Sequence, residues 1–218
     1  MCRDIDWCEL RTHGWTRVSG ITNRLEALTL ARSIGRPLLS PTGELVKELI
    51  PKPKVHARPG TLSEIYDRGF FPLHTDTAFW PVPARYVIFR ARGDIRRKIT
   101  ILTFAELFRG RPEGLRRLAE HSVWLARTPS ESFYCSMKFS SGEGTGWRYD
   151  SQCMIPANEA AAKIRQILGH LLLCDHMECI DWKEDLAVVL CNWEVLHGRG
   201  PSPMNEGNRI LERIYVMR

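Results

Sequence analysis

Phe70-Phe-Pro-Leu-His-Thr-Asp-Thr-Ala-Phe-Trp80 and, far downstream, Asn192-Trp-Glu-Val-Leu-His-Gly-Arg-Gly-Pro201 are the two stretches that decide how this chain folds. In extended chain, positions i and i+2 point the same way about 6.6 Å apart, so His74 and Asp76 can converge on one ion. A later strand end that supplies His197 completes two imidazoles and one carboxylate. Such a set leaves coordination positions open, which suits a non-haem Fe(II) that binds a co-substrate and O2.

Two arginines follow His197 in a strand-like segment, Arg209–Met217. Alternation along a strand places Arg209 and Arg213 on one face together with Leu211. An unpaired guanidinium on such a face is costly, and arginine binds a carboxylate with a bidentate fork. The pair therefore indicates a dicarboxylate co-substrate that chelates iron at its other end. The alternative is that both arginines pair with acidic side chains of the protein itself.

These motifs resemble those of the taurine dioxygenase and clavaminate synthase superfamily of Fe(II)- and 2-oxoglutarate-dependent oxygenases. The stretch 73–79 is similar to the first metal motif of that superfamily, the stretch 192–199 to the second, and Arg209-x-x-x-Arg213 to its terminal arginine pair. The resemblance covers roughly residues 70–218, with specific motifs at its two ends.

The resemblance implies a role for individual residues. His74, Asp76 and His197 match the iron ligands, and Arg209 matches the residue that holds the far carboxylate of 2-oxoglutarate. Thr100 falls where the superfamily often places a second contact to 2-oxoglutarate, although Arg97 and Lys98 replace the usual glycines before it. The implied cofactors are Fe(II), 2-oxoglutarate and O2.

The implied fold is mainly β with flanking helices, built on a double-stranded β-helix (a cupin-like jelly roll). The residue patterns agree, because strand-like runs recur at irregular spacing and do not alternate evenly with helices as in a doubly wound sheet. Ser140–Gly146 reads as a loop, and the first helix is expected to bury Leu25, Leu28, Ala31 and Ile34. The helical patterns cover 23–34, 103–108, 112–121 and 157–173, and the strand-like runs cover 85–92, 132–139, 147–154, 186–193 and 209–217.

The composition is that of one globular domain, with 218 residues of which 44% are hydrophobic and 26% charged. Residues 1–69 are expected to pack a helix and extended segments on a jelly-roll core formed by 70–218. The longest apolar run, Leu186–Cys191, is strand-sized and predicts no membrane span. The acidic N-terminus does not resemble a signal peptide, and seven scattered cysteines indicate reduced thiols, so a cytoplasmic location is expected.

The expected reaction is hydroxylation of a small anionic or amino-acid-like metabolite, with release of succinate and CO2. Desaturation or epoxidation in natural-product biosynthesis is the alternative with the same cofactors, whereas related halogenases lack the carboxylate that Asp76 supplies. The candidate substrate contacts are Arg213, Trp80 and Arg148. Arg148 lies beside Asp150, so the two offer a cation and an anion, but a structural pairing explains Arg148 equally well.

Parts of the sequence also fit two other kinds of protein. A net charge of +6 and five basic residues within Arg90–Lys98 suggest a nucleic-acid-binding protein with a structural metal site, but no aromatic platform accompanies them. The gap of 197 − 76 = 121 positions between Asp76 and His197 also resembles the taurine dioxygenase branch more than nucleic-acid demethylases. We therefore expect a small-molecule substrate and neither nucleic acid nor membrane as partner, and a homodimer is compatible with the sequence.

A structural zinc site is the second alternative. The stretch Cys174-Asp-His-Met-Glu-Cys179, with Cys191 downstream, carries metal-ligand residue types. Structural zinc sites usually pair two close Cys-x-x-Cys knuckles, and a second knuckle is missing here. An oxygenase-like protein without turnover is disfavoured, because every iron-ligand position is filled.

Overall fold

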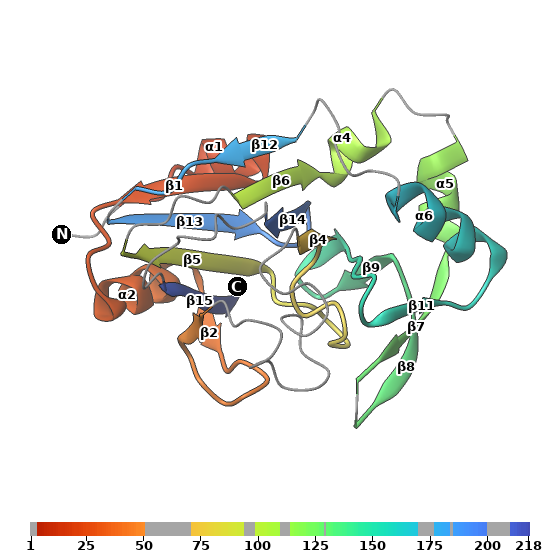
Figure 1. Ribbon diagram of the computed structural model, residues 1–218, viewed down its shortest axis with the longest axis horizontal. Helices are drawn as coiled ribbons and strands as arrows, with labels where there is room; N and C mark the ends of the chain where they lie inside the picture. The colour runs from red at the N-terminus through yellow and green to blue at the C-terminus, as the bar shows by residue number, and fades with distance from the viewer. Residues whose placement is uncertain are drawn as a thin grey trace.

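The fold is mainly antiparallel β, and we describe it from a computed structural model (Figure 1). Two β-sheets face each other across a shared hydrophobic core, which is the arrangement of a jelly roll, and helices flank them. The structure describes residues 4–50, 71–93, 99–109, 114–128, 130–169, 177–183, 185–199 and 210–218.

The larger sheet has the strand order β1-β13-β5-β15-β2, with β3 also paired to β15. Its central strand β5 is buried on both faces, which explains why it carries a nearly continuous apolar run and no clean alternation. The N-terminal segment joins this sheet directly, because β1 pairs with β13 in an unbroken antiparallel register. The strands are β1 (Trp15–Ser19), β2 (Arg36–Leu38), β3 (Lys47–Leu49), β5 (Tyr86–Arg92), β13 (Leu186–Cys191) and β15 (Ile210–Met217).

The smaller sheet has the order β12-β6-β14-β4 and brings the two metal motifs together, because β4 and β14 are neighbours. Alternate residues of both sheets point into the space between them, where Phe89, Ile101 and Val195 belong to one buried cluster. The metal motifs therefore open into the interior of the jelly roll. The strands are β4 (Phe71–His74), β6 (Ile99–Thr103), β12 (Glu178–Ile180) and β14 (Val195–Arg199).

The helices and the remaining strands surround this core. Helix α2 packs on the outer face of the larger sheet, and α5 and α6 lie beside a three-stranded sheet, β11-β7-β8, at the right of Figure 1. The helices are α1 (Trp7–His13), α2 (Arg24–Ile34), α4 (Phe104–Phe108), α5 (Gly114–His121) and α6 (Glu159–Gly169). The strands are β7 (Val123–Arg127), β8 (Ser132–Ser136), β9 (Lys138–Ser141), β10 (Gly144–Trp147) and β11 (Met154–Pro156).

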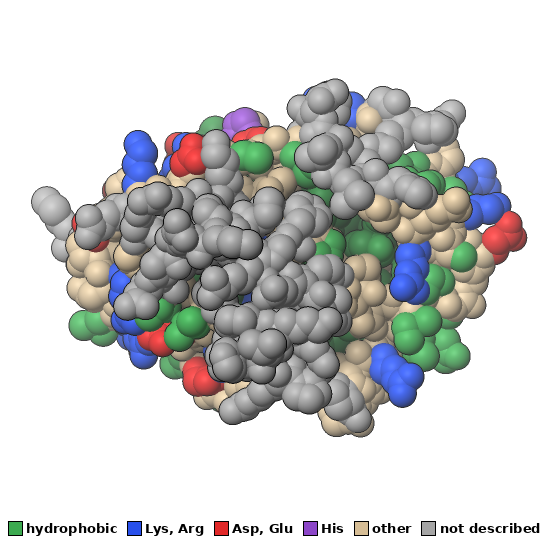
Figure 2. Space-filling view, in the orientation of Figure 1, with side chains coloured by type: hydrophobic (Ala, Val, Ile, Leu, Met, Phe, Trp, Pro, Cys, Tyr) green, Lys and Arg blue, Asp and Glu red, His purple; other side chains and the backbone are tan. Residues whose placement is uncertain are grey.

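Hydrophobic side chains gather at the lower right of Figure 2, over the region where Figure 1 draws β7, β8 and β11. The large exposed hydrophobic residues of these three strands are Val123, Tyr134 and Ile155. No helix in the described part of the chain is long and apolar enough to cross a membrane.

The first predicted helix is confirmed as α2, but the residues that it buries differ from the prediction. Asn23 caps α2 by accepting the backbone N–H of Glu26, and the helix ends before Gly35 as predicted. The buried face consists of Ala27, Leu30, Ala31 and Ile34, whereas Leu25 is 68% exposed. The predicted buried face was therefore wrong at Leu25, because this residue lies in the first turn of the helix and does not contact the sheet.

Two further predictions were wrong. The predicted loop 140–146 is the turn of a β-hairpin, since β9 pairs with β10 from Ser141 opposite Gly144 to Lys138 opposite Trp147. The predicted strand 147–154 breaks after Trp147, and chain without strand structure leads to the short strand β11. One of the glycines that read as a flexible loop is closely packed, because a Cβ at Gly146 would come within 2.8 Å of Phe139 and Trp193, whereas Gly142 and Gly144 have open space beside them.

Candidate metal centre

The two histidines face each other across neighbouring strands. His197 of β14 lies directly opposite His74 of β4 in the antiparallel register, so both side chains lie on the same face. Their ring centroids are 4.4 Å apart, and the residues His74 and His197 are only 7% and 4% exposed. The sheet itself therefore fixes the relative position of the two imidazoles.

Asp76 joins them from the chain just beyond β4. Thr75 faces away as predicted: its backbone N–H donates to the carbonyl of Tyr149 (2.7 Å), and its hydroxyl accepts the Tyr149 N–H (3.1 Å). This turns the Asp76 carboxylate to the histidines, with Oδ2 3.4 Å from Nε2 of His197 and Oδ1 3.9 Å from Nε2 of His74. One ligand atom from each of the three residues lies within 4.8 Å of the other two.

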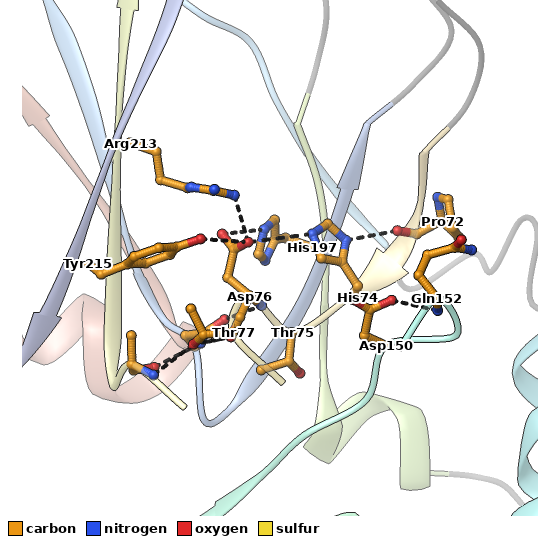
Figure 3. Close-up of polar contacts among 12 residues, drawn as sticks. Pro72, His74, Thr75, Asp76, Thr77, Asp150, Gln152, His197, Arg213 and Tyr215 are labelled. Atoms are coloured by element: carbon orange, nitrogen blue, oxygen red, sulfur yellow. Dashed lines mark hydrogen bonds and ion pairs between the residues drawn. The ribbon is translucent and has the colours of Figure 1, made fainter. Parts of the chain in front are cut away.

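The two oxygens of Asp76 have different surroundings (Figure 3). Oδ1 accepts a hydrogen bond from Nη1 of Arg213 at 2.7 Å and from the hydroxyl of Tyr215 at 3.3 Å. Oδ2 is buried and has no hydrogen-bond partner within the described residues. A buried carboxylate oxygen without a hydrogen-bond partner is costly. Binding of a cation to Oδ2 would remove this cost.

The protonation states at the site suit a cation. Burial and the neighbouring His197 lower the pKa of His74 to about 3, so this ring is neutral at physiological pH. Burial alone would raise the pKa of Asp76, but the charge of Arg213 and the contacts with His197 and His74 outweigh it and hold that pKa well below its usual range. Burial raises the pKa of Tyr215 well above its usual value, so its hydroxyl keeps its proton.

These residues fit a divalent metal ion. Nδ1 of His74 lies 3.0 Å from the carbonyl oxygen of Pro72, and because a carbonyl only accepts, Nδ1 carries the proton. The lone pair of His74 is therefore on Nε2, which points to Asp76, and a hydrogen bond of this kind is typical of metal-binding histidines. Two imidazole nitrogens and one carboxylate oxygen on a single side form the facial set expected for non-haem Fe(II).

Two of the predicted substrate residues lie at this site. Arg213 bonds Asp76 directly, as described above. Trp80 packs edge-on against Tyr215, with ring centroids 5.6 Å apart, and so forms part of the wall beside Asp76.

Arg148 is placed differently. It is buried, and its two Nη atoms donate to the carbonyls of Ala78, Trp80 and Pro81, while its guanidinium lies over Phe139. These contacts favour the structural explanation of Arg148, in which it holds the segment after the first metal motif.

The predicted 2-oxoglutarate contacts have separate outcomes. Thr100 lies opposite Gly198 in the β6–β14 ladder while Ile101 lies opposite His197, so alternation puts Thr100 on the other face of the sheet from His197. This register speaks against a contact between Thr100 and a co-substrate bound at the metal. Arg209 lies outside the described residues, and its role stays a prediction.

The sequence analysis did not predict Tyr215 at the site, and it considered Asp150 only as an anion beside Arg148. Tyr215 could have been found, because it lies two positions after Arg213 and therefore on the same face of β15. Asp150 lies beside His74 in Figure 3, is partly buried, and accepts the backbone N–H of Gln152 at 2.8 Å. Burial raises its pKa to about 6.

The alternative sites receive little support where the structure describes them. In the basic stretch 90–98, Arg90 is buried against Glu212 and Arg92 pairs with Glu48, while residues 94–98 lie outside the described part. Cys174 and His176 of the suggested zinc site also lie outside it. Among the residues described, the one group of His, Cys, Asp or Glu close enough to share an ion is His74, Asp76 and His197.

Comparison with known proteins identifies the class to which this fold belongs. The sequence matches no protein-family model and no curated protein. Solved structures match along nearly the whole chain, and the first of them include an asparagine oxygenase with Fe(II) and the non-haem iron oxygenase OrfP. This chain therefore shares its fold with those oxygenases, which agrees with the predicted fold class.

Three structures illustrate the likeness. Asparagine oxygenase, in complex with Fe(II), (2S,3S)-3-hydroxyasparagine and succinate, has a TM-score of 0.75 at 16% identity over 97% of this chain and 78% of its own. The oxygenase OrfP, in complex with Fe, succinate and (3S)-hydroxy-L-Arg, has a TM-score of 0.72 at 19% identity over 95% and 76%. The PvcB protein of Pseudomonas aeruginosa has a TM-score of 0.67 at 17% identity over 96% and 77%.

Proposed function

We propose that this protein is an Fe(II)- and 2-oxoglutarate-dependent oxygenase that hydroxylates a small amino-acid-like metabolite. The observation that carries the proposal is the buried, unpartnered Oδ2 of Asp76 beside Nε2 of His197, with the neutral ring of His74 completing the set. It lies in the fold of oxygenases whose structures contain Fe together with α-ketoglutaric acid or succinate.

The charges at the site support a dianionic co-substrate. A divalent ion (+2), ionised Asp76 (−1) and Arg213 (+1) together leave a charge of +2 in a buried place. Uncompensated charge is costly there, and 2-oxoglutarate with two carboxylates would neutralise it. Arg209, twelve positions after His197, is the residue we propose for the far carboxylate of 2-oxoglutarate.

The bound metal and co-substrate would supply the oxidising chemistry that replaces a C–H bond of the substrate by C–OH, with release of succinate and CO2. His74, Asp76 and His197 hold the ion, Arg213 orients the carboxylate of Asp76, and Trp80 and Tyr215 shield the site from bulk water on one side. Because Asp76 retains its carboxylate at the metal, we propose hydroxylation over halogenation.

Asp150 supports an amino-acid-like substrate. It is partly buried and lies on the His74 side, opposite Arg213 across the three ligands in Figure 3. A substrate with an ammonium group and a carboxylate would satisfy Asp150 with one end and an arginine with the other. The asparagine- and arginine-derived ligands named for the similar structures are of this kind. We propose a cytoplasmic location, where Fe(II) and the free cysteines stay reduced.

Anaerobic spectroscopy tests the proposal. Fe(II) followed by 2-oxoglutarate should give the weak visible charge-transfer band of the chelate in the wild type. His197→Ala should lose the band, and Arg209→Ala should need far more 2-oxoglutarate to reach it. No band in the wild type, or the same band in His197→Ala, would overturn the proposal.

Turnover then identifies the substrate class. A panel of amino acids is incubated with the loaded enzyme, and succinate release and product mass are measured. We expect stimulation by amino acids that carry an additional polar group, and a gain of one oxygen atom in the product. A loss of two hydrogen atoms would instead indicate desaturation.

A further inference from the structure

Asn192 is a fully buried side chain at the end of β13, and it makes every hydrogen bond that its amide nitrogen can donate. Its Nδ2 donates to the carbonyls of Asp76 (2.9 Å) and Ala84 (2.8 Å), and its Oδ1 accepts the backbone N–H of Asp76 (3.0 Å). Its own backbone N–H donates to the carbonyl of Arg85 (2.8 Å).

The main chain of Asp76 needs such a partner. β4 ends at His74, so Asp76 lies beyond the ladder that holds the two histidines. Thr77, the next residue, has a positive φ of 57°, which is unfavourable for a β-branched residue. Its hydroxyl donates to the carbonyl of Asp76 and accepts the N–H of Ala84 (2.8 Å), so the Thr77 side chain itself stabilises the turn.

Asn192 also connects the two metal motifs. It lies five positions before His197, in the turn between β13 and β14, while the backbone that it holds belongs to Asp76. The sheet register sets His74 against His197, and the Asn192 amide sets Asp76 against both. An asparagine side chain provides one acceptor and two donors in one plane, which matches one N–H and two carbonyls.

We propose that Asn192 is a positioning residue of the metal centre, which fixes the Asp76 carboxylate relative to the two imidazoles. The role rests on the proposed function only in that the triad binds a metal ion. Partners of this kind, which orient a ligand without touching the ion, typically change metal affinity about 10- to 100-fold when they are replaced.

Cobalt(II) affinity of the metal-free protein, measured by competition with a chelator, tests the proposal without any turnover. Asn192→Ser and the nearly isosteric Asn192→Asp should each bind Co(II) about 10- to 100-fold more weakly than the wild type. Asn158→Ser is the matched control, because Asn158 also bonds three backbone groups (the N–H of Val123 and Ala161 and the carbonyl of His121) but lies at α6. It should lower the melting temperature and leave the affinity unchanged.

The outcomes separate this role from the proposed function. Wild-type affinity in a folded Asn192 variant, with loss of binding in His197→Ala, overturns the role of Asn192 alone. Equal affinity in His197→Ala and the wild type overturns the metal site, and with it the proposed function.

A measurement on the wild type covers the case in which neither Asn192 variant folds. The Asp76 amide, whose hydrogen bond goes to the Asn192 side chain, should be strongly protected from hydrogen exchange in the metal-free protein. Rapid exchange of that amide overturns the proposal.

Discussion

Asp76 shows how one carboxylate is divided between two tasks. Its Oδ1 is held by Arg213 and Tyr215, and its Oδ2 is left without a partner beside His197. The arrangement leaves one oxygen available to an ion, so under the proposed function the carboxylate would bind the metal through Oδ2. Two histidines and one carboxylate would leave room for the chelating co-substrate that the proposed function requires.

Tyr215→Phe removes one of the two contacts that hold Oδ1. At 3.3 Å the hydroxyl–carboxylate bond is long, and Arg213 stays in place, so we expect Co(II) affinity to fall about 10-fold, the lower end for partners of metal ligands. Chelator competition measures it. Tyr134→Phe, on a tyrosine that is 72% exposed in β8, is the control and should change nothing. A Tyr215→Phe protein with wild-type affinity would show that Arg213 alone holds the carboxylate.

Asp150 is predicted to cost stability in exchange for substrate binding. Burial raises its pKa from about 3.8 to about 6 in the folded protein, which corresponds to about 3 kcal/mol. Because the folded state holds the proton more tightly than the unfolded state, stability is lost as the pH rises from about 4 to about 6, and the full cost is present at pH 7.

Asp150→Asn therefore should stabilise the metal-free protein by up to about 3 kcal/mol at pH 7, and by almost nothing near pH 4. Urea unfolding at the two pH values measures the difference between variant and wild type. The same variant should bind a cationic substrate more weakly. Equal stabilisation at both pH values would mean that the charge of Asp150 is not its cause.

At the scale of elements, β15 uses its two faces for different purposes. One face carries Arg213 and Tyr215 to the metal centre, and the other carries Glu212, which is 1% exposed. Glu212 accepts from Nε of Arg90 at 2.8 Å, and Nε of Arg24 from α2 lies 3.4 Å from its other oxygen. This buried ion pair holds β15 against β5 and α2, and so fixes the strand that delivers Arg213.

Glu212→Gln should lower the free energy of unfolding by about 3 kcal/mol, because it leaves the buried guanidinium of Arg90 without its counter-charge. Denaturant unfolding measures the loss. Glu120→Gln is the control, since the Glu120–Lys138 pair (2.9 Å) is partly exposed and should contribute less than about 1 kcal/mol. Similar losses in the two variants would contradict the importance of the buried pair.

The elements also show what the sequence could predict. The i, i+2 spacing predicted that His74 and Asp76 lie close together, and the alternation along β15 predicted which residues share a face with Arg213, because both are local properties of extended chain. The wall formed by Trp80 and Tyr215 and the bonds of Arg148 to three carbonyls depend on contacts between distant segments. The register also speaks against the predicted contact between Thr100 and 2-oxoglutarate. The sequence pattern can locate a strand, but the face on which one residue lies depends on how the strand is paired.

For the whole molecule, the jelly roll makes one site from motifs that are 121 positions apart (197 − 76). β4 and β14 lie next to each other in the smaller sheet, and Asn192 links the turn before β14 to the chain after β4. The fold class followed from the two motifs and the irregular strands. Strand β8 lies within the predicted run 132–139, but its pairing with β7 and the hairpin β9–β10 were not predicted, because pairing depends on contacts between segments and β10 consists mostly of small residues.

Metal binding should therefore stabilise the fold as a whole, since the ion joins β4, the segment after it and β14. At a concentration of 100 times Kd, an ion that binds only the folded state adds about 2.7 kcal/mol, which for a chain of this size corresponds to a rise in Tm of roughly 5 to 10 °C. Thermal unfolding with Co(II) and with a chelator measures the shift.

His74→Ala should abolish it, because Nε2 of His74 is one of three ligands and the ion then loses a third of its protein contacts. A shift that persists in His74→Ala would place the stabilising ion elsewhere on the molecule. A Tm independent of metal in the wild type would mean that the triad does not bind the ion, which contradicts the proposed metal site.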